Sequence, residues 1–251
     1  MLPPISVVIP AFNEAVRIGD TLAVTIRYLE KESPTSEVIV VNDGSTDSTG
    51  EMIRKVSAVP SSVAVRLLEN FPNRGKGAAV RTGLSSATKP IGVFFDADLS
   101  TPIDELPKIV APIASGEVDI AFGSRALDRK LIGNRQPWRR EQGGRVFNLV
   151  VRVATGLPFW DTQCGFKAFR MEACRPIIEA AKIIGFGFDV ELLLLAQRAG
   201  LRLREIPVRW NHHEGSKIRF VHDSVRMLRE VLSLRAKNSA HKQFCHPGPE
   251  R

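Results

Sequence analysis

An apolar run followed by two carboxylates occupies residues 91–98, Ile91-Gly92-Val93-Phe94-Phe95-Asp96-Ala97-Asp98. A run of this length, rich in aromatic and β-branched residues, is typical of a buried strand in an α/β sheet. Open α/β sheets bind ligands at the carboxyl ends of their strands, which is where Asp96 and Asp98 stand. Side chains at positions i and i+2 of an extended segment point the same way, so the two carboxylates can converge. We expect them to bind Mg²⁺ or Mn²⁺; the plainer alternative is a polar turn.

The composition is that of a globular domain with excess positive charge. The 251 residues are 43% hydrophobic and 25% charged, enough to bury a full core. A formal net charge of +8 favours anionic partners such as phosphates, nucleic acid or an acidic membrane. Three scattered cysteines argue against a disulfide framework or a zinc site. A strand pattern begins almost at once and the apolar runs are short, so we expect a cytoplasmic protein, at most peripheral on the membrane.

Strand-like runs alternate with helical spacing along the chain. This alternation predicts an α/β fold, a mostly parallel sheet with helices on both faces. The expected strands are residues 5–9, 38–41, 63–68, 91–95, 118–122, 165–170 and 203–210. Helical patterns cover residues 18–29, 46–56, 189–199 and 219–235. Residues 125–145 predict a basic loop and residues 236–251 a disordered tail, so we expect one domain over residues 1–235.

Polar loops follow three of the expected parallel strands and would share one edge of the sheet. Asp43, after the second strand, could accept hydrogen bonds from a base or a ribose. Asn13 and Glu14, after the first strand, could face the same crevice or simply begin a helix. Residues 73–79 form a glycine-flanked basic turn, where backbone N–H groups with Lys76 would favour a diphosphate. The turn matches neither GxGxxG nor a Walker A sequence, which weakens dehydrogenase and P-loop interpretations.

The motifs PxFNE, VNDGSTD, NxGKGAAVRxG and DAD, in this order, resemble those of inverting family 2 glycosyltransferases of the GT-A fold. The resemblance covers residues 5–235. Three later motifs, Asp161–Lys167 (DTQCGFK), Phe188–Leu193 (FDVELL) and Glu214–Lys217 (EGSK), are similar to those of the dolichyl-phosphate glucosyltransferase branch, related to dolichyl-phosphate mannose synthase. That branch implies transfer of a hexose, with UDP-glucose the expected donor, to a polyprenyl phosphate.

The resemblance also implies roles for individual residues. Those expected to hold the nucleoside are Pro10, Asn13, Glu14 and Asp43. Lys76 would lie near the nucleotide, while Asp96 and Asp98 would bind the sugar and the metal-bridged diphosphate. Arg125 and Arg140 would contact phosphate in the catalytic site.

A phosphate acceptor poses an electrostatic problem rather than a need for a base. A phosphate monoester is already ionised near neutral pH, so it can attack the anomeric carbon directly. One anion must nevertheless approach another, and arginine suits bidentate phosphate contact. The candidate acceptor-phosphate residues are Arg125, Arg139, Arg140, Arg145 and Lys217. Any of these arginines could instead be a solvated surface residue.

Acidic and histidine residues near the later motifs leave alternatives open. Asp189 and Glu191 begin an apolar helix, where acids stabilise the N-terminal end, but an acid in this region serves hydroxyl-accepting relatives as general base. We expect Asp189 in the catalytic site, orienting the donor sugar or an arginine. His212 and His213 favour a loop that closes over the diphosphate, with a metal cluster as the alternative.

The last expected helix, residues 219–235, is basic and amphipathic. Its apolar stripe includes Val221, Val225, Met227 and Leu232, and could pack on the domain or lie on an anionic cytoplasmic leaflet. Two other functions compete with polyprenyl-phosphate transfer. One is a family 2 transferase that acts on a saccharide or small-molecule hydroxyl. The other is a nucleotide- or nucleic-acid-binding module, which no RNA or recognition-helix motif supports, so we expect no nucleic-acid partner.

Overall fold

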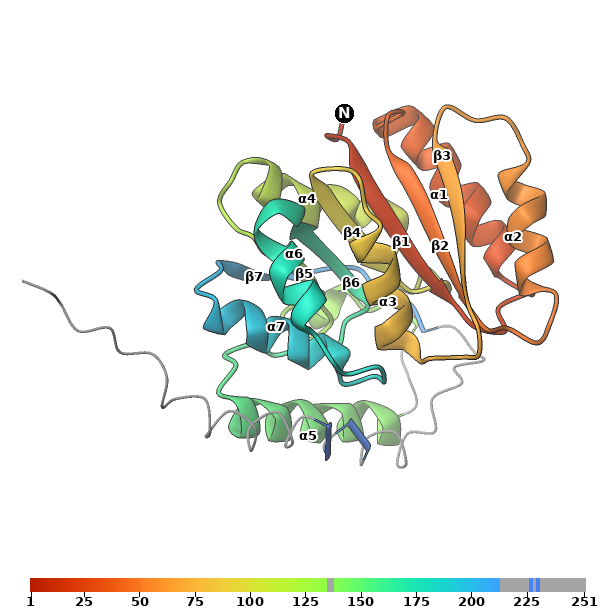
Figure 1. Cartoon of the computed structure of the whole chain (residues 1–251). Helices are drawn as coiled ribbons and strands as arrows, with labels where there is room; N and C mark the ends of the chain where they lie inside the picture. The colour runs from red at the N-terminus through yellow and green to blue at the C-terminus, as the bar shows by residue number, and fades with distance from the viewer. Residues whose placement is uncertain (135–137, 213–225, 228, 231–251) are drawn as a thin grey trace, which may run out of the picture.

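The computed structural model contains one seven-stranded sheet with helices on both faces (Figure 1). It describes residues 1–134, 138–212, 226–227 and 229–230. The strand order is β3-β2-β1-β4-β6-β5-β7. The strands are β1 (Ile5–Ala11), β2 (Glu37–Asp43), β3 (Ala64–Asn70), β4 (Ile91–Phe95), β5 (Ile120–Ser124), β6 (Phe166–Arg170) and β7 (Leu203–Pro207). The predicted strands are confirmed, with shifts at their ends.

The sheet is parallel except at β6. Strands β3, β2, β1 and β4 pair in parallel, as do β5 and β7. Strand β6 runs antiparallel between β4 and β5. Because β1 lies between β2 and β4, the order of connection reverses beside β1, and the loops that leave β1 and β4 diverge around a crevice. The predicted mostly parallel α/β sheet is therefore confirmed.

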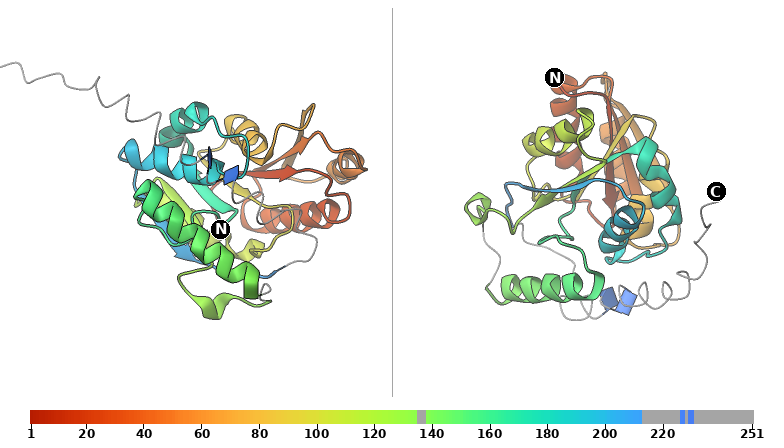
Figure 2. Two further views of the ribbon diagram at one scale, coloured as in Figure 1. Left: turned by 90° about the horizontal axis from the view of Figure 1, so that it is seen from below. Right: turned by 90° about the vertical axis from the view of Figure 1, so that its left-hand side faces the viewer.

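Helices of the described chain cover both faces of this sheet (Figures 1 and 2). They are α1 (Ile18–Glu32), α2 (Thr49–Ser57), α3 (Lys76–Ser85), α4 (Leu106–Ala114), α5 (Trp138–Thr155), α6 (Met171–Ala180) and α7 (Phe188–Arg198), with short 3₁₀ turns at Ile103–Glu105 and Arg129–Leu131. The helices predicted over residues 18–29, 46–56 and 189–199 are confirmed. No helix in the described ranges is both long and apolar enough to cross a bilayer.

The prediction of a basic loop over residues 125–145 is wrong in its second half, because α5 begins at Trp138. Gly143 and Gly144 interrupt the helical pattern, but Phe147 and Val151 on the same helix are buried against the core. This tertiary packing outweighs the weak local propensity. Most of the helix predicted over 219–235, and the tail at 236–251, lie outside the described residues.

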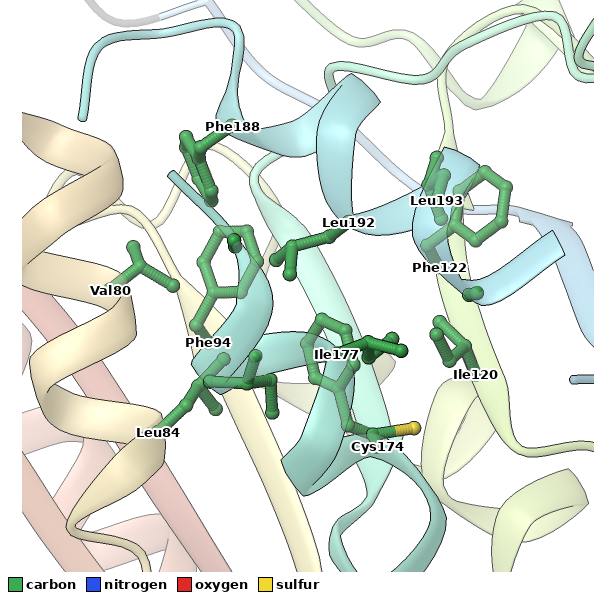
Figure 3. Close-up of a cluster of buried hydrophobic side chains, with 14 of the residues drawn as sticks. Val80, Leu84, Phe94, Ile120, Phe122, Cys174, Ile177, Phe188, Leu192 and Leu193 are labelled. Carbon is green, nitrogen blue, oxygen red and sulfur yellow. The ribbon is translucent and has the colours of Figure 1, made fainter. Parts of the chain in front are cut away.

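Two apolar clusters fill the space between the sheet and its helices. The first, shown in Figure 3, brings α3, α6 and α7 against the sheet and includes Phe94, which lies 5.6 Å from Phe188 between ring centroids. The second contains Phe95 with residues of α1 and α4. Adjacent residues of β4 thus pack on opposite faces of the sheet, as the two-residue period of a strand requires. Met227 joins the first cluster, so this member of the C-terminal stripe packs on the domain.

A buried carboxylate, Glu37, ties the strands at the edge opposite the polar loops. It accepts hydrogen bonds from Ser6 Oγ at 2.7 Å and from Thr88 N and Oγ1 at 2.8 and 2.7 Å. Arg66 donates to its second oxygen at 3.1 Å. Burial raises the pKa of Glu37, but the hydrogen bonds from Thr88, Ser6 and Arg66 outweigh it and lower that pKa from 4.5 to about 2.

We expect Glu37→Gln to destabilise the protein in a pH-dependent way. The pKa of Glu37 is depressed in the folded state, so its ionised form stabilises the fold above about pH 4.5, by roughly 3 kcal/mol, and this contribution is lost as the pH falls toward 2. Urea denaturation should show a loss of about 2–3 kcal/mol near neutral pH and a much smaller loss near pH 3. The exposed Glu179→Gln is the matched control. An equal loss at both pH values would contradict this account of the network.

Candidate active site

The polar loops after β1, β2 and β4 meet in a cavity of about 560 Å³, which we call the carboxylate cavity. This volume is typical of small-ligand sites. Six residues predicted from the sequence line it: Pro10, Glu14, Asp43, Lys76, Asp96 and Asp98. The described C-terminal residues Arg226, Met227 and Glu230 complete its wall.

Asp96 and Asp98 follow β4 directly and face this cavity. Lys76, the first residue of α3, places its Nζ 2.6 Å from Asp96 Oδ1. Burial lowers the pKa of Lys76, but the negative charges of Asp96, Asp189 and Asp98 outweigh it and raise that pKa above its ordinary value of 10.5. Lys76 is therefore a permanent cation. One oxygen of Asp98 accepts the backbone N–H of Ser100 at 2.9 Å, which fixes the turn that carries it.

The pair Asp96 and Asp98 fits a divalent ion that arrives with a substrate. Magnesium is commonly held by one or two carboxylates, with water and substrate phosphates completing its shell. Among the residues that the structure describes, no group of three or more His, Cys, Asp and Glu side chains could hold a metal ion unaided. His212 stacks on Trp210, with ring centroids 6.0 Å apart. His213, Glu214 and Lys217 lie outside the described residues.

The predicted nucleoside residues hold the loops of the cavity in place. Asp43 is buried and accepts the backbone N–H of Gly75 at 2.7 Å and Nδ2 of Asn70 at 2.8 Å. Asn13 has a positive φ of 54°, and its Oδ1 accepts the N–H of Thr46 at 2.8 Å. Asn13 is absent from the described lining of the cavity. Direct contact of Asn13 and Asp43 with a nucleoside stays a prediction.

The amino end of α3 differs from the anion site expected from its backbone N–H groups. Gly75 precedes the helix with a φ of 100°, and a Cβ there would overlap the carbonyl oxygen of Ile184. That same oxygen accepts the N–H groups of Gly77 at 2.9 Å and Ala78 at 3.4 Å. Since these donors are already paired, the positive charge at this end of α3 is that of the Lys76 side chain.

The segment Asp161–Lys167 holds residues of the site in position by three contacts. Gly165 accepts the N–H of Asp96 at 3.2 Å, and a Cβ at Gly165 would overlap the Asp96 carboxylate. Asp161 accepts Nε and Nη2 of Arg125 at 2.6 and 2.7 Å, a bidentate pair. These two contacts fix the positions of Asp96 and Arg125 relative to each other.

The third contact joins Lys167 to Asp189 inside the core. Lys167 is fully buried; its Nζ lies 2.6 Å from Asp189 Oδ1 and 2.6 Å from the carbonyl oxygen of Cys164. Burial raises the pKa of Asp189 above its ordinary value despite the opposing charges of Lys167 and Lys76. The partner of Asp189 is thus a lysine and not the arginine expected as one alternative; that Asp189 orients the donor sugar stays a prediction. Glu191 is also structural and accepts the N–H groups of Lys182 and Ile183.

Lys167 was missed by the sequence reasoning. The available signal was a lysine at the centre of the apolar strand Phe166-Lys167-Ala168-Phe169. A charge in such a strand requires a buried counter-charge.

A second cavity, of about 490 Å³, is lined by four arginines and is called here the arginine cavity. The arginines are Arg125, Arg129, Arg145 and Arg152. Its remaining lining is partly apolar, with Ile132, Leu149, Trp160 and Trp210. The arginine cavity therefore combines positive charge with an apolar wall.

Contacts within the arginine cavity fix its charges. The guanidinium of Arg125 lies 5.6 Å from the ring centroid of Trp210, and that of Arg152 lies 3.8 Å from Trp160. Glu141 pairs with both Arg129 and Arg145.

Arg125 also experiences the charge of Asp96, a residue of the carboxylate cavity. Burial lowers its pKa, but the charge of Asp161, with a smaller contribution from Asp96, raises that pKa above its ordinary value. Of the predicted acceptor-phosphate residues, Arg125 and Arg145 line the arginine cavity. Arg139 and Arg140 belong to the first turn of α5, but their side chains lie outside the described part of the structure.

Solved structures of a glycosyltransferase share this fold. Glucosyl-3-phosphoglycerate synthase from Mycobacterium tuberculosis, in complex with Mn²⁺, UDP and glucosyl-3-phosphoglycerate, aligns with a TM-score of 0.67 at 22% identity, over 93% of this chain and 79% of that one. A second structure of that enzyme contains Mg²⁺ and UDP and aligns with the same TM-score over 93% of this chain and 78% of that one, again at 22% identity. The fold is thus that of the GT-A glycosyltransferases.

The sequence comparisons define the family. The model of glycosyl transferase family 2 matches residues 6–178. Dolichyl-phosphate beta-glucosyltransferase of Dictyostelium discoideum is 32% identical over 92% of this chain and 73% of its own length. The human enzyme of that name is 33% identical over 93% and 75%. Glycosyltransferase AglD of Haloferax volcanii is 35% identical over 91% of this chain, which spans 36% of its length. The chain belongs to glycosyl transferase family 2.

We expect Lys167→Met to cost about 3–5 kcal/mol of unfolding free energy near pH 8, because it leaves Asp189 buried and unpaired. An acid whose folded-state pKa is raised destabilises the fold above its unfolded pKa, so part of the loss should be recovered as the pH is lowered toward about 5. Urea denaturation measures both effects.

The double variant Lys167→Met/Asp189→Asn should recover most of the loss, because it leaves no buried charge. The exposed Lys182→Met should change little. A cost below about 1 kcal/mol for Lys167→Met at pH 8 would refute the importance of this pair.

Proposed function

We propose that this protein transfers glucose from UDP-glucose to the phosphate of a polyprenyl phosphate, with inversion at the anomeric carbon. The main support is a pair of cavities whose residues are linked through the segment Asp161–Lys167, one lined by Asp96, Asp98 and Lys76, the other by four arginines and an apolar wall. A sugar diphosphate suits the first cavity and a lipid phosphate suits the second. The named activity of the dolichyl-phosphate relatives agrees with this pairing.

The donor would occupy the carboxylate cavity. Asp96 and Asp98 would hold Mg²⁺ or Mn²⁺ with the diphosphate, and this ion would supply charge stabilisation to the departing oxygen. Lys76, permanently cationic at the floor of the cavity, would bind the same diphosphate. The nucleoside would rest on the loops of Pro10, Asn13, Glu14 and Asp43. Preorganised positive charge at the leaving group is the largest contribution such a site can make to the rate.

The acceptor phosphate would occupy the arginine cavity. Arg125 and Arg145 would bind it, joined by Arg139, Arg140 and Lys217 as the family motifs imply. A phosphate oxygen would attack the anomeric carbon from the face opposite the diphosphate; the new C–O bond forms as the bond to the diphosphate breaks. No proton has to be removed, because the phosphate is already ionised.

The buried position of Asp189 disfavours a hydroxyl acceptor. Such an acceptor needs a general base within hydrogen-bonding reach. Asp189 lines neither cavity; the residue is 3% exposed, and its carboxylate is bound to Lys167. A residual transfer rate in Asp189→Asn would further disfavour this alternative.

A lipid acceptor implies that the protein acts at a membrane surface. We propose that residues 1–235 form the catalytic domain and act at the cytoplasmic face of an anionic membrane. The basic helix expected over residues 219–235 would contribute to that contact, although Met227 packs inward.

The function is tested by a donor screen. Release of nucleoside diphosphate is measured for UDP- and GDP-linked hexoses, with and without a polyprenyl phosphate. UDP-glucose should give release that depends on the lipid phosphate. Transfer to saccharide hydroxyls, without transfer to lipid phosphate, would overturn the proposal.

In the same assay, Asp98→Asn should reduce transfer by about a hundredfold or more, because it weakens the site at which leaving-group charge develops. A chelator should inactivate the wild type, and added Mg²⁺ or Mn²⁺ should restore it. The exposed Asp20→Asn should behave as wild type, and circular dichroism should report an intact fold for both variants. Full activity in excess chelator would rule out the metal.

Arg145→Gln should raise the KM for polyprenyl phosphate about tenfold to a hundredfold while changing the donor KM little, because one charge-assisted contact is worth about 1.5–3 kcal/mol. Its removal leaves Glu141 paired with Arg129, so the local fold should survive. Arg204→Gln, at a surface pair with Glu117, is the control. An equal rise in both KM values would show that Arg145 does not select the acceptor.

A further inference from the structure

Helix α5 turns an apolar face to solvent. Val146, Leu149, Val150 and Val153 form what we call the α5 stripe, and Val146, Leu149 and Val153 are 62%, 59% and 76% exposed. Their spacing of three, one and three residues places them on one side of the helix. The opposite side packs Phe147 and Val151 into the core. The helix lies along the outside of the molecule in all views (Figures 1 and 2).

The stripe is continuous with the arginine cavity. Leu149 belongs to the stripe and also lines the cavity. Arg145 and Arg152 lie about two helical turns apart on the same flank of α5 and line the cavity as well. A ligand whose phosphate lies among these arginines could therefore extend an apolar chain past Leu149 onto the stripe.

Charge and aromatic side chains around the stripe match a lipid surface. Scattered exposed apolar residues are ordinary, but a contiguous stripe marks an interaction site. Arginines beside an apolar face can place their stems on acyl chains and their charges among lipid phosphates. Trp138, at the start of α5, is 72% exposed, and Trp160 stacks on Arg152. Such amphipathic rings favour the level of the headgroups.

A second copy of the chain fits the stripe less well. In a two-fold symmetric dimer the same patch meets itself, which would bring Arg145 and Arg152 near their own equivalents. Like charges at an interface are unfavourable. The one acidic residue of α5, Glu141, is already held by Arg129 and Arg145. The arginines beside the α5 stripe therefore favour an anionic partner over a second copy of the chain.

We propose that the α5 stripe is the docking surface for an anionic bilayer, with α5 lying in the headgroup region and the arginine cavity opening at the level of the lipid phosphates. The role of this surface rests on the proposed function, because the acceptor would reach the cavity from the membrane. It is a different surface from the helix expected over residues 219–235.

The test uses the full chain and vesicles of phosphatidylcholine with phosphatidylglycerol. Val146→Gln/Val153→Gln removes apolar area without changing charge, and neither valine lines a cavity. Sedimentation should show binding about tenfold or more weaker than wild type, as loss of two partly buried valines predicts. The matched Val24→Gln/Val59→Gln, exposed valines on α1 and after α2, should bind as wild type. High salt, or vesicles without the anionic lipid, should weaken wild-type binding.

Activity separates this inference from the proposed function. The rate on a short, water-soluble prenyl phosphate should be the same in Val146→Gln/Val153→Gln and wild type, whereas the rate on vesicle-embedded acceptor should fall with binding. Vesicle binding unaffected by the substitutions would overturn the docking surface. So would a wild-type dimer, seen by sedimentation velocity, that the two valine substitutions dissociate. If binding depends on the stripe but no polyprenyl phosphate is ever glycosylated, the docking surface stands and the proposed function fails.

Discussion

A buried ammonium, that of Lys167, fixes one end of the segment Asp161–Lys167, whose residues contact Asp96 of one cavity and Arg125 of the other. It lies on β6, directly across from Phe94 of β4 and Phe122 of β5 in the strand register. Its Nζ lies 5.5 Å from the centroid of one ring and 5.9 Å from the other. Desolvating such a charge is costly, and only the combination of Asp189, the Cys164 carbonyl and the two rings offsets it. Any rearrangement that separated α7 from β6 would expose that cost.

The segment Asp161–Lys167 holds side chains of both cavities in place. One end of it fixes the guanidinium of Arg125, its middle lies against the carboxylate of Asp96, and its other end is pinned by Asp189. Two groups on different strands thereby keep a constant separation. A reaction between two bound anions depends on such fixed geometry, because small displacements of either reactant sharply reduce the rate.

Local sequence patterns predicted the sheet because each strand carries its own apolar signal. The end of β4 placed Asp96 and Asp98 at the edge of the sheet, and the glycine-flanked turn placed Lys76 at the start of α3. Local patterns could not predict contacts between segments that are distant in the sequence. The pairing of the α3 amides with Ile184 and the burial of Lys167 against Asp189 depend on residues brought together only by the fold. Helix α5 was missed for a related reason: its two glycines and its arginines obscure a period that only the packing of Phe147 and Val151 enforces.

The balance of charge in the arginine cavity bears on turnover. Its described lining holds four arginines against two carboxylates, Asp161 and Glu141, so about two positive charges remain uncompensated. A phosphate monoester carries nearly two negative charges at neutral pH, and glycosylation converts it to a diester with one. In the proposed reaction the cavity would match the charge of the acceptor before transfer and exceed that of the product afterwards. The arginines proposed to hold the acceptor would therefore hold the product less tightly.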